Sequence, residues 1–414
     1  MTGEGQRIVF LTMASYPVTE AERNLYSDLF DEIVERGNDV IVFRPEFSRW
    51  HGTPSIVERR DVTVISVPTG RVQKVSWFIK AVNTILLEYR YTRAVKKYIS
   101  ETLDLVVYST PPITVLSAIR WLKNRTGCRT YLLLKDIFPQ NAVDLEMIKR
   151  GSLIWRFFRS KERKLYAISD AIGCMSNANV TYLLRENPEI PVEKVHVCPN
   201  AIKPIPLDQI AACRNEVPKQ FAVIPNDRLK LIYAGNLGKP QGIDFLIDVI
   251  EAIKTRGDVH LTIVGSGTEY QRLQKAIDQS RPPNVVLSSH LPKSEYLSLL
   301  SHMDIGLVFL DRRFTIPNFP SRVLDYLDFS LPVIACTDTS SDLGVVLEEA
   351  NAGWWCRSGD VTSFVACVEA YAGDASRRKS MGRNARDLLE RSFSVRDATT
   401  IMLRTAIPVQ EATG

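Results

Sequence analysis

Short apolar runs alternate with helical patterns through the first half of the chain. Residues 7–12 (RIVFLT) and 39–43 (DVIVF) are apolar, and the apolar positions of residues 20–37 between them recur with helical spacing. More apolar runs follow in this half, at 62–67, 104–109, 129–134 and 170–175. Because these runs lack the alternation of a half-exposed strand, they predict parallel strands that are covered on both faces.

The same pattern starts again after a proline-rich interruption. Residues 195–209 (VHVCPNAIKPIPLDQ) contain Pro199, Pro204 and Pro206, which predicts a linker between two domains. Beyond the linker we expect strands at 229–235, 259–265, 284–289, 304–310 and 331–337, with helices at 242–257, 268–279 and 322–327 and two more after Gly359.

A chain of 414 residues is also too long for one ordinary core. We therefore expect an α/β protein with two doubly wound, Rossmann-like domains. The N-terminal domain is predicted at 1–200 and the second at 201–393, with 394–414 packing back on the first. Ligands of such sheets bind at the carboxyl ends of the strands, which predicts a ligand in a cleft between the domains.

Composition and charge exclude several classes of protein. Seven scattered cysteines without a CxxC pair argue against a disulfide framework or a zinc site. No apolar run approaches the ~18 residues of a membrane span, and the first residues lack the pattern of a signal peptide. We expect a cytoplasmic protein without a metal site, since no histidine has the spacing of a metal ligand.

Three glycines follow the strand predicted at 229–235. The segment 232–242 (IYAGNLGKPQG) has neither the spacing of a dinucleotide fingerprint nor the G-K-[ST] ending of a Walker A loop. Small residues still let backbone amides approach an anion, and a helix that begins near Gly242 presents free N–H groups and a positive dipole end. The alternative is a strand-to-helix turn whose glycines provide clearance only.

A second segment that contains candidate ligand-binding residues is 314–338 (FTIPNFPSRVLDYLDFSLPVIACTD). Ser321 is a good N-cap residue and predicts a helix that starts at Arg322. The start of that helix and Arg322 would attract a phosphate, and Asp325 would accept hydrogen bonds from ribose hydroxyls. Asp325 is equally explained as a surface carboxylate that the helix dipole favours.

These segments resemble the retaining glycosyltransferases of family 4, which have the GT-B fold of two Rossmann-like domains facing a central cleft. The resemblance is to the bacterial branch that builds O-antigen, capsule and other cell-envelope polysaccharides. Four matches carry it in order: PNAI; YAGNLGKPQGIDFLI; IVGSGTEYQRLQ with NVVLSSHLPKSEYLSLLSHMDIGLVFL; and PSRVLDYLDFSLPVIA. It is strong over residues 195–395 and weaker before residue 130.

The resemblance implies a donor site in the second domain. Asp325 stands where the family has the second acid of its E-x7-E motif, which binds the ribose. Pro317 replaces the first acid, which binds the sugar, so backbone at Asn318 and Phe319 is left to meet the sugar hydroxyls. The remaining candidates for donor binding are Gly235, Asn236, Gly238, Lys239, Gln241, Gly267, His290, Leu291, Ser321 and Arg322, with the nucleotide base resting near His290 and Leu291.

This chain departs from the family at several of these places. Asn236 and Gln241 stand where the family has cations on the diphosphate, which leaves Lys239 and Arg322 for that role. Ser330 stands where the family usually has glycine. The chain has no D-x-D triplet, the usual metal–diphosphate clamp of the other glycosyltransferase fold. We therefore expect transfer without a metal or another cofactor, with Arg322 stabilising the leaving group.

The first domain is expected to bind the acceptor. Lys135 and Asp136 follow the strand at 129–134, where family 4 commonly has an acid or a histidine. Asp136 is the candidate catalytic residue, with an N-cap as its alternative explanation. Lys135, Glu20 and Glu22 are candidates for acceptor binding, although the two glutamates also fit the solvated start of a helix.

Two stretches combine basic and aromatic residues. Residues 71–97 and 149–166 each contain seven basic residues and one acid, with tryptophan and phenylalanine between them. Such helices suit an anionic membrane surface. Solvated helix faces would give the same pattern; nucleic acid would too, but no nucleic-acid module accompanies it. We expect binding at the inner face of the cell membrane and no nucleic-acid partner.

The sequence therefore predicts a hexosyltransferase that moves a sugar from a nucleotide, expected to be UDP, to a cell-envelope glycan or a polyprenyl-linked acceptor. Two alternatives stay open. One is a non-hydrolysing UDP-sugar 2-epimerase on the same fold. The other is a non-catalytic subunit that binds sugar nucleotides, which Pro317 makes plausible.

Overall fold

The computed structural model describes residues 5–13, 23–47, 52–59, 61–70, 77–214, 221, 224–225, 227–289 and 291–406, without the side chains of 77–85. Its contacts divide the chain into two compact units. Unit 1 comprises Met1–Lys203 and Val395–Gly414, and unit 2 comprises Pro204–Ser394. The division thus falls three residues after the predicted boundary.

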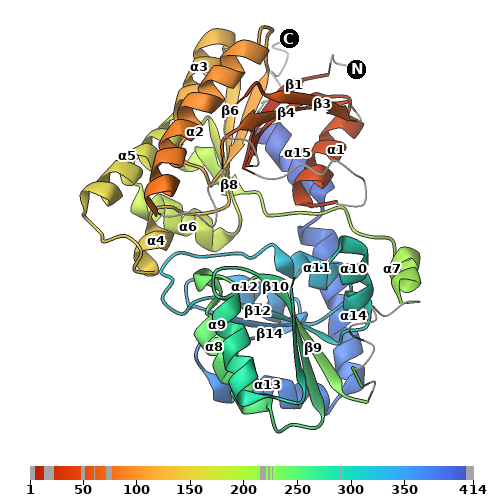
Figure 1. Cartoon of the computed structure of the whole chain (residues 1–414). Coiled ribbons are helices and arrows are strands. Elements are labelled where there is room, and N and C mark those ends of the chain that lie inside the picture. Colours follow the sequence, from red (N-terminus) through yellow and green to blue (C-terminus); the bar gives the residue numbers. More distant parts are fainter. Residues whose placement is uncertain are drawn as a thin grey trace. The chain divides into compact units, whose positions relative to one another are not determined.

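Unit 1 is built on an eight-stranded sheet in the order β3-β4-β2-β1-β5-β6-β7-β8 (Figure 1). Its strands are β1 (Arg7–Leu11), β2 (Asp39–Glu46), β3 (Ser55–Arg59), β4 (Val62–Pro68), β5 (Leu105–Ser109), β6 (Arg129–Leu134), β7 (Ala171–Cys174) and β8 (Val195–Val197). The six central strands are near-continuous apolar runs, as predicted. All neighbours pair in parallel except β3, an exposed edge strand that pairs antiparallel with β4.

Helices cover both faces of this sheet. They are α1 (Leu25–Glu35), α2 (Trp77–Tyr98), α3 (Leu116–Thr126), α4 (Gln140–Asp144), α5 (Leu153–Ile168), α6 (Asn177–Glu186), the short 3₁₀ turn η2 (Val192–Lys194) and α15 (Val395–Ala406). One face packs against α1 and α15, whose Phe30 and Met402 are fully buried in a common core. On the other side, α2, α3 and α5 form a layer (Figure 1).

Helix α1 begins later than its pattern predicts. Asn24 has an extended backbone, and its side chain accepts hydrogen bonds from the amides of Tyr26 and Ser27. Ser27 Oγ in turn accepts from the Asn24 amide, which completes a capping box. The prediction of a helix from residue 20 was therefore wrong at 23–24, and residues 20–22 lie outside the described residues.

Unit 2 is built on a six-stranded parallel sheet in the order β11-β10-β9-β12-β13-β14. Its strands are β9 (Leu229–Asn236), β10 (Val259–Ser266), β11 (Val285–Ser288), β12 (Ile305–Phe309), β13 (Val333–Thr337) and β14 (Gly353–Arg357). Its helices are α7 (Leu207–Cys213), η4 (Lys239–Gln241, a 3₁₀ turn), α8 (Ile243–Ile253), α9 (Tyr270–Ser280), α10 (Lys293–Ser301), α11 (Arg322–Asp328), α12 (Leu343–Glu349), α13 (Val361–Ala372) and α14 (Ala375–Ser392).

The core of unit 2 lies between the sheet and the layer of α8, α9 and α13 (Figure 1). Phe309 of β12 contacts both Phe245 of α8 and Phe364 of α13. Helix α11 packs against α14 and contacts β12 and β13. This arrangement places the first residues of α11 beside the end of the sheet from which the glycine segment leaves.

The prediction of an irregular linker was wrong at both of its ends, and some elements of unit 2 were not predicted. The expected linker contains β8, which pairs with β7, and helix α7. Strand β14 and helix α12 were not predicted, and three helices rather than two follow Gly359. No helix in the described part of the chain is long and apolar enough to cross a membrane.

Candidate functional site

The strand order of unit 2 contains a switch point between β9 and β12. The chain runs from β9 outward to β10 and β11, and then returns to β12 on the other side of β9. Ligands of open α/β sheets bind outside the carboxyl ends of the strands at such a point. The glycine segment follows β9 at this end, which makes it the expected ligand-binding loop of unit 2.

The glycine segment packs closely against the residues after β12. The amide of Asp311 donates to the carbonyl of Pro240 at 2.9 Å. Gly242 has a φ of +55°, and a Cβ there would lie 2.9 Å from the carbonyl oxygen of Leu310. A side chain at position 242 would therefore separate the two loops that flank the switch point.

Polar groups inside the loop bind one another. Asn236 Nδ2 donates to Gln241 Oε1 at 2.8 Å, and the amide of Gly238 donates to the same oxygen at 3.2 Å. A Cβ at Gly267 would lie 2.2 Å from the carbonyl oxygen of Leu237. Hydrogen bonds within the loop thus account for Asn236 and Gln241, and the close backbone contact accounts for Gly267. Lys239 remains as the exposed cation of this loop.

Arg322, the first residue of α11, lies under this loop. Its guanidinium carbon is 4.8 Å from the centre of the Tyr233 ring. The same carbon lies 3.0 Å from where a Cβ at Gly235 would be. Arg322 Nη1 is buried and has no hydrogen-bond partner among the described residues. A buried cationic donor without an acceptor is costly, and an anion at the glycine loop would provide the acceptor.

The start of α11 differs in one detail from its prediction. Ser321 occupies the N-cap position, but its backbone is helical and its side chain makes no capping bond. Asp325 in the first turn is about one third exposed. It accepts a hydrogen bond from the Tyr296 hydroxyl at 3.1 Å and lies 3.7 Å from the ammonium of Lys293. Asp325 is therefore held from α10 by a tyrosine and a lysine.

Four other donor candidates are packed, bonded within the protein or outside the described residues. Phe319 is buried and stacks against Phe393 with ring centres 5.4 Å apart. Leu291 is also buried. The Asn318 carbonyl accepts a hydrogen bond from Ser341 Oγ at 2.7 Å. His290 lies outside the described residues. Asn318 and Phe319 thus belong to the packed loop before α11, whereas Arg322 and Asp325 are charged residues of α11 itself.

In unit 1, Asp136 lies just after the carboxyl end of β6. Thr110 Oγ1, after the neighbouring β5, accepts hydrogen bonds from the amides of Lys135 and Asp136, each at 3.0 Å. Asn141 Nδ2 donates to both carboxylate oxygens of Asp136, at 2.8 and 2.9 Å. Pro139 is the N-cap of α4, so Asp136 does not cap that helix.

The surroundings of Asp136 change its acidity. Burial raises the pKa of Asp136 to about 6, although the hydrogen bonds from Asn141 and the Ile137 amide favour the carboxylate. An acid with a pKa close to neutral pH is suited to proton transfer or to orienting a hydroxyl group. Asp136 thus has the acidity that its predicted role requires.

Lys135 has structural partners within unit 1. Its ammonium donates to Asn200 Oδ1 at 2.7 Å and lies 4.6 Å from the centre of the Tyr26 ring. Lys135 therefore links β6 to the segment after β8 and to α1. The other two candidates for acceptor binding, Glu20 and Glu22, lie outside the described residues.

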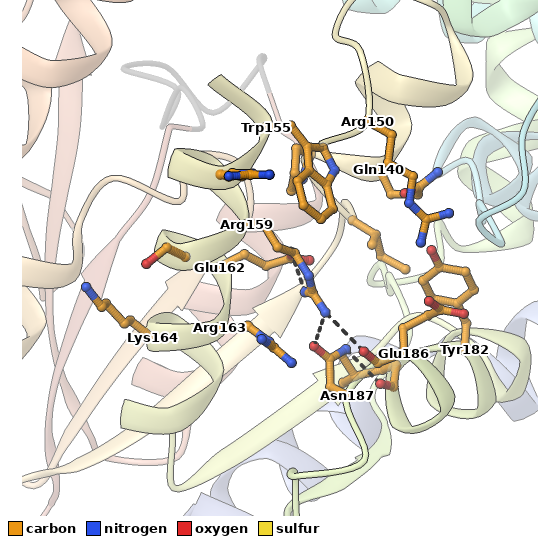
Figure 2. Close-up of a pocket in the computed structure, with 15 residues that line it drawn as sticks. Gln140, Arg150, Trp155, Arg159, Glu162, Arg163, Lys164, Tyr182, Glu186 and Asn187 are labelled. Atoms are coloured by element: carbon orange, nitrogen blue, oxygen red, sulfur yellow. Dashed lines mark hydrogen bonds and ion pairs between the residues drawn. The ribbon is translucent and has the colours of Figure 1, made fainter. Parts of the chain in front are cut away.

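Unit 1 also contains a cavity of about 540 Å³ between α4, α5 and α6 (Figure 2). The lining residues are Ile137, Pro139, Gln140, Arg150, Trp155, Arg156, Arg159, Ser160, Glu162, Arg163, Lys164, Tyr182, Leu183, Glu186 and Asn187. Eight of the fifteen belong to the basic stretch 149–166. The charge of this stretch was the signal in the sequence, but the cavity was not predicted.

The other basic stretch is described in part. Residues 71–76 and the side chains of 77–85 lie outside the description. In the remainder of α2, Tyr89 is exposed, and Glu88 forms an ion pair with Lys161 of α5 at 2.7 Å. Helix α2 is thereby tied to the second basic stretch. Within the described ranges, no group of three His, Cys, Asp or Glu residues is placed to hold a metal ion.

Comparison with known proteins agrees with the geometry of unit 2. Residues 215–388 match the family described as glycosyl transferases group 1. The matched residues lie within unit 2 and include its switch point. The probable glycosyltransferase WbjE of Pseudomonas aeruginosa is 23% identical over 298 residues, 70% of this chain and 71% of that protein. CapM of Staphylococcus aureus, a capsular polysaccharide biosynthesis glycosyltransferase, is 27% identical over 187 residues, 44% of this chain and 46% of that protein.

The whole chain has a two-domain, GT-B-like fold. An Escherichia coli structure described as trehalose-6-phosphate bound with UDP-2-fluoro glucose matches with a TM-score of 0.75 and 11% identity. The match covers 97% of this chain and 99% of the other. Residues 215–388 contain every donor candidate, whereas Asp136, Lys135 and the cavity lie outside these matched residues.

Proposed function

We propose that the protein transfers a sugar from a nucleotide sugar, with UDP as the nucleotide, to a cell-envelope glycan or a lipid-linked acceptor. The observation that carries the proposal is the buried Nη1 of Arg322, which has no hydrogen-bond partner among the described residues and lies under the glycine loop at the switch point of unit 2. The UDP-sugar named in the E. coli structure and the capsular polysaccharide named for CapM support the choice of donor and product.

In this proposal the glycine loop and Arg322 hold the diphosphate. Arg322 and Lys239 neutralise the charge that develops on the leaving group, and the surrounding phenol rings keep the guanidinium in place. Asp325 binds the ribose hydroxyls, with Tyr296 and Lys293 fixing its carboxylate. Two fixed cations reduce the need for a metal, so the expected reaction is metal-independent.

Unit 1 provides the acceptor side of the reaction. Asp136 is mostly ionised above its pKa of about 6 and can accept a hydrogen bond from the attacking hydroxyl. Asn141 holds both oxygens of the carboxylate and so fixes its orientation. We expect retention of the anomeric configuration, which nuclear magnetic resonance of the product would check.

The basic stretches 71–97 and 149–166 place the protein at an anionic membrane surface in this proposal. Helix α5 exposes Leu153, Ile154 and Phe157 next to cationic side chains. Exposed apolar and basic residues on one helix favour the interface of an anionic bilayer. A lipid-linked acceptor would be reached from this surface.

A non-catalytic role is the second candidate, because Pro317 replaces the acid that contacts the sugar in the resembling family. Binding and turnover separate the two. We would titrate UDP, GDP, ADP and NAD by calorimetry in the presence of a chelator, and then follow hydrolysis of the UDP-sugars whose nucleotide binds. Saturable UDP binding with donor turnover supports the transferase. UDP binding without turnover in the presence of any acceptor tested supports the non-catalytic subunit. Binding of NAD alone contradicts both.

A further inference from the structure

The cavity between α4, α5 and α6 has an excess of positive charge. Five cationic side chains and two carboxylates line it. Figure 2 shows Arg159 reaching from α5 toward Asn187 at the end of α6, with Arg150, Trp155 and Gln140 grouped at another part of the wall. A lining with this charge favours an anion over a neutral ligand.

Structural ion pairs account for part of that charge. Arg159 donates to Glu162 Oε2 and to Asn187 Oδ1, each at 2.6 Å. Arg163 pairs with Glu189 at 3.1 Å, outside the cavity lining. Within the described part of the chain, Arg150, Arg156 and Lys164 have no carboxylate partner. These three cations therefore remain available to a ligand.

Neutral donors complete the lining. The indole N–H of Trp155 is buried and has no hydrogen-bond partner among the described residues. Burial raises the pKa of the Tyr182 hydroxyl, which stays protonated and able to donate. The cavity thus offers unused N–H and O–H donors together with unpaired cations, the combination that binds the oxygens of a phosphate.

Exposed apolar side chains lie on and just before α5, the helix that lines the cavity. Met147 precedes α5, and Leu153, Ile154 and Phe157 lie in its first two turns; all four are exposed, Leu153 by 84%. Trp155 and Arg156, which line the cavity, are adjacent in the sequence to Ile154 and Phe157. The exposed apolar side chains would suit a hydrocarbon chain attached to a phosphate in the cavity.

We propose that this cavity is a second anion site, separate from the donor site, which binds the phosphate or diphosphate group of the acceptor. The assignment rests on the proposed function, since it takes unit 1 to bind the acceptor. Ile137 and Pro139 line the cavity within three residues of Asp136. An acceptor anchored by its phosphate would therefore be held near the candidate catalytic carboxylate.

The probe for this site is inorganic pyrophosphate, titrated into the full-length protein by calorimetry. The test variant is Arg150→Gln/Arg156→Gln, because neither arginine makes an ion pair with any residue that the structure describes. The matched control is Arg120→Gln/Arg125→Gln, which removes two exposed arginines of α3 outside the cavity and outside both basic stretches. Arg322→Gln reports pyrophosphate binding at the donor site, and UDP binding is measured on every variant.

We expect pyrophosphate affinity to fall at least about tenfold in the Arg150/Arg156 variant and to stay within about twofold of wild type in the control. UDP affinity should be unchanged in both. The proposal is overturned if pyrophosphate does not bind the wild-type protein, or if Arg322→Gln removes all of its binding. Loss of UDP binding with intact pyrophosphate binding would instead contradict the proposed function alone.

A second arm identifies the source of the phosphate. Phosphatidylcholine vesicles with and without a polyprenyl diphosphate are floated with the wild type and the Arg150/Arg156 variant. Flotation that needs the diphosphate and both arginines assigns the site to a lipid headgroup. Pyrophosphate binding without such flotation assigns it to a water-soluble phosphorylated acceptor. Equal flotation of both proteins on both vesicle types contradicts recognition of the lipid phosphate by the cavity.

Discussion

The environment of Arg322 is better suited to the protein with a bound anion than to the protein without a ligand. Its Nη1 lacks a partner, and the Tyr233 ring and Gly235 enclose the guanidinium. A buried charge of this kind costs stability until an anion satisfies it. A substitution of Arg322 should therefore change both the free energy of unfolding and the affinity for the proposed donor.

The first prediction concerns the variant Arg322→Gln. UDP affinity should fall about 10- to 100-fold, the value of one or two charge-assisted hydrogen bonds. Without ligand, the free energy of unfolding should stay the same or rise, because the uncompensated charge is gone. Calorimetry and urea unfolding would measure the two effects. Arg383→Gln, at an exposed arginine of α14, is the control and should change neither.

The second prediction concerns Asp136→Asn. Transfer should fall about 100- to 10,000-fold, the usual contribution of a positioned acid or base, whereas UDP binding should be unchanged. Asn141 can still donate to the new amide oxygen, so the loop is expected to keep its structure. Full activity of the variant in a transfer assay would remove Asp136 from the mechanism.

The same variant has a distinct effect on stability. The folded protein holds the Asp136 proton more tightly than the unfolded chain, since its pKa rises from 3.8 to about 6. The stability that this acid contributes is present below pH 3.8 and is lost as the pH rises through 6. Asp136→Asn should thus be more stable than wild type at pH 8, by on the order of 1–2 kcal/mol for a half-buried group, and equal to it near pH 4. Urea unfolding at both pH values would measure the difference.

Among the elements, the loops after β9 and β10 are joined by a close backbone contact. Gly267 lies where a Cβ would be 2.2 Å from the Leu237 carbonyl oxygen and 2.4 Å from its carbon, so backbone must move to admit any side chain. Leu237 belongs to the glycine loop. The contact makes the shape of that loop depend on a residue thirty positions away.

The third prediction is therefore that Gly267→Ala lowers the free energy of unfolding by about 1–3 kcal/mol and weakens UDP binding. Gly257→Ala is the matched control, because a Cβ at Gly257 meets nothing within 4 Å. Urea unfolding and UDP titration of the two variants would test the contact. Equal behaviour of both alanines would mean that the loop adapts at no cost.

How well the elements could be predicted depended on burial. Strands such as β5 and β12 are apolar at every position, so their runs identify them. Strand β3 is exposed at its three central residues and pairs at a sheet edge, where little in its sequence sets it apart from a loop. Strand β14 (GWWCR) is short and mixed. Its pairing with β13 comes from tertiary contact rather than local pattern.

The same limit applied to the candidate site: local patterns identified its segments but not the tertiary contacts between them. Glycine spacing and helix-start residues pointed to the loop after β9 and to Arg322. The enclosure of Arg322 by Tyr233 joins positions 89 residues apart, which no local pattern gives. Ser330 shows the opposite case: its φ of +55° explains why glycine is usual there in the resembling family.

In the whole molecule, the chain order of the two units is interleaved. The sequence after Ser394 returns to unit 1, where α15 contacts α1 and β6. The amide of Val395 donates to the Ile202 carbonyl at 3.0 Å, and Cys198 Sγ lies 3.7 Å from the Ala398 carbonyl. Unit 1 therefore depends on a helix encoded after all of unit 2.

The fourth prediction tests this division. Met402→Ala should lower the stability of unit 1 by about 2–5 kcal/mol, since Met402 is fully buried against α1 and the sheet. Met381→Ala is the matched variant in the core of unit 2. Hydrogen exchange should rise in β1 and β6 for the first variant and in β9 and β12 for the second. Exchange that rises in both units for either variant would mean that they unfold as one.

The position of α15 also sets the order in which the molecule can fold during synthesis. Domains usually fold one after another as they leave the ribosome, beginning with the first. Here the first unit cannot close its core until residues 395–406 have emerged, whereas residues 204–394 already hold every strand and core helix of the second. Unit 2 is thus complete before unit 1. The surface of the N-terminal sheet that α15 covers therefore stays exposed during synthesis. It stays so for the time that the ribosome needs to translate an entire domain.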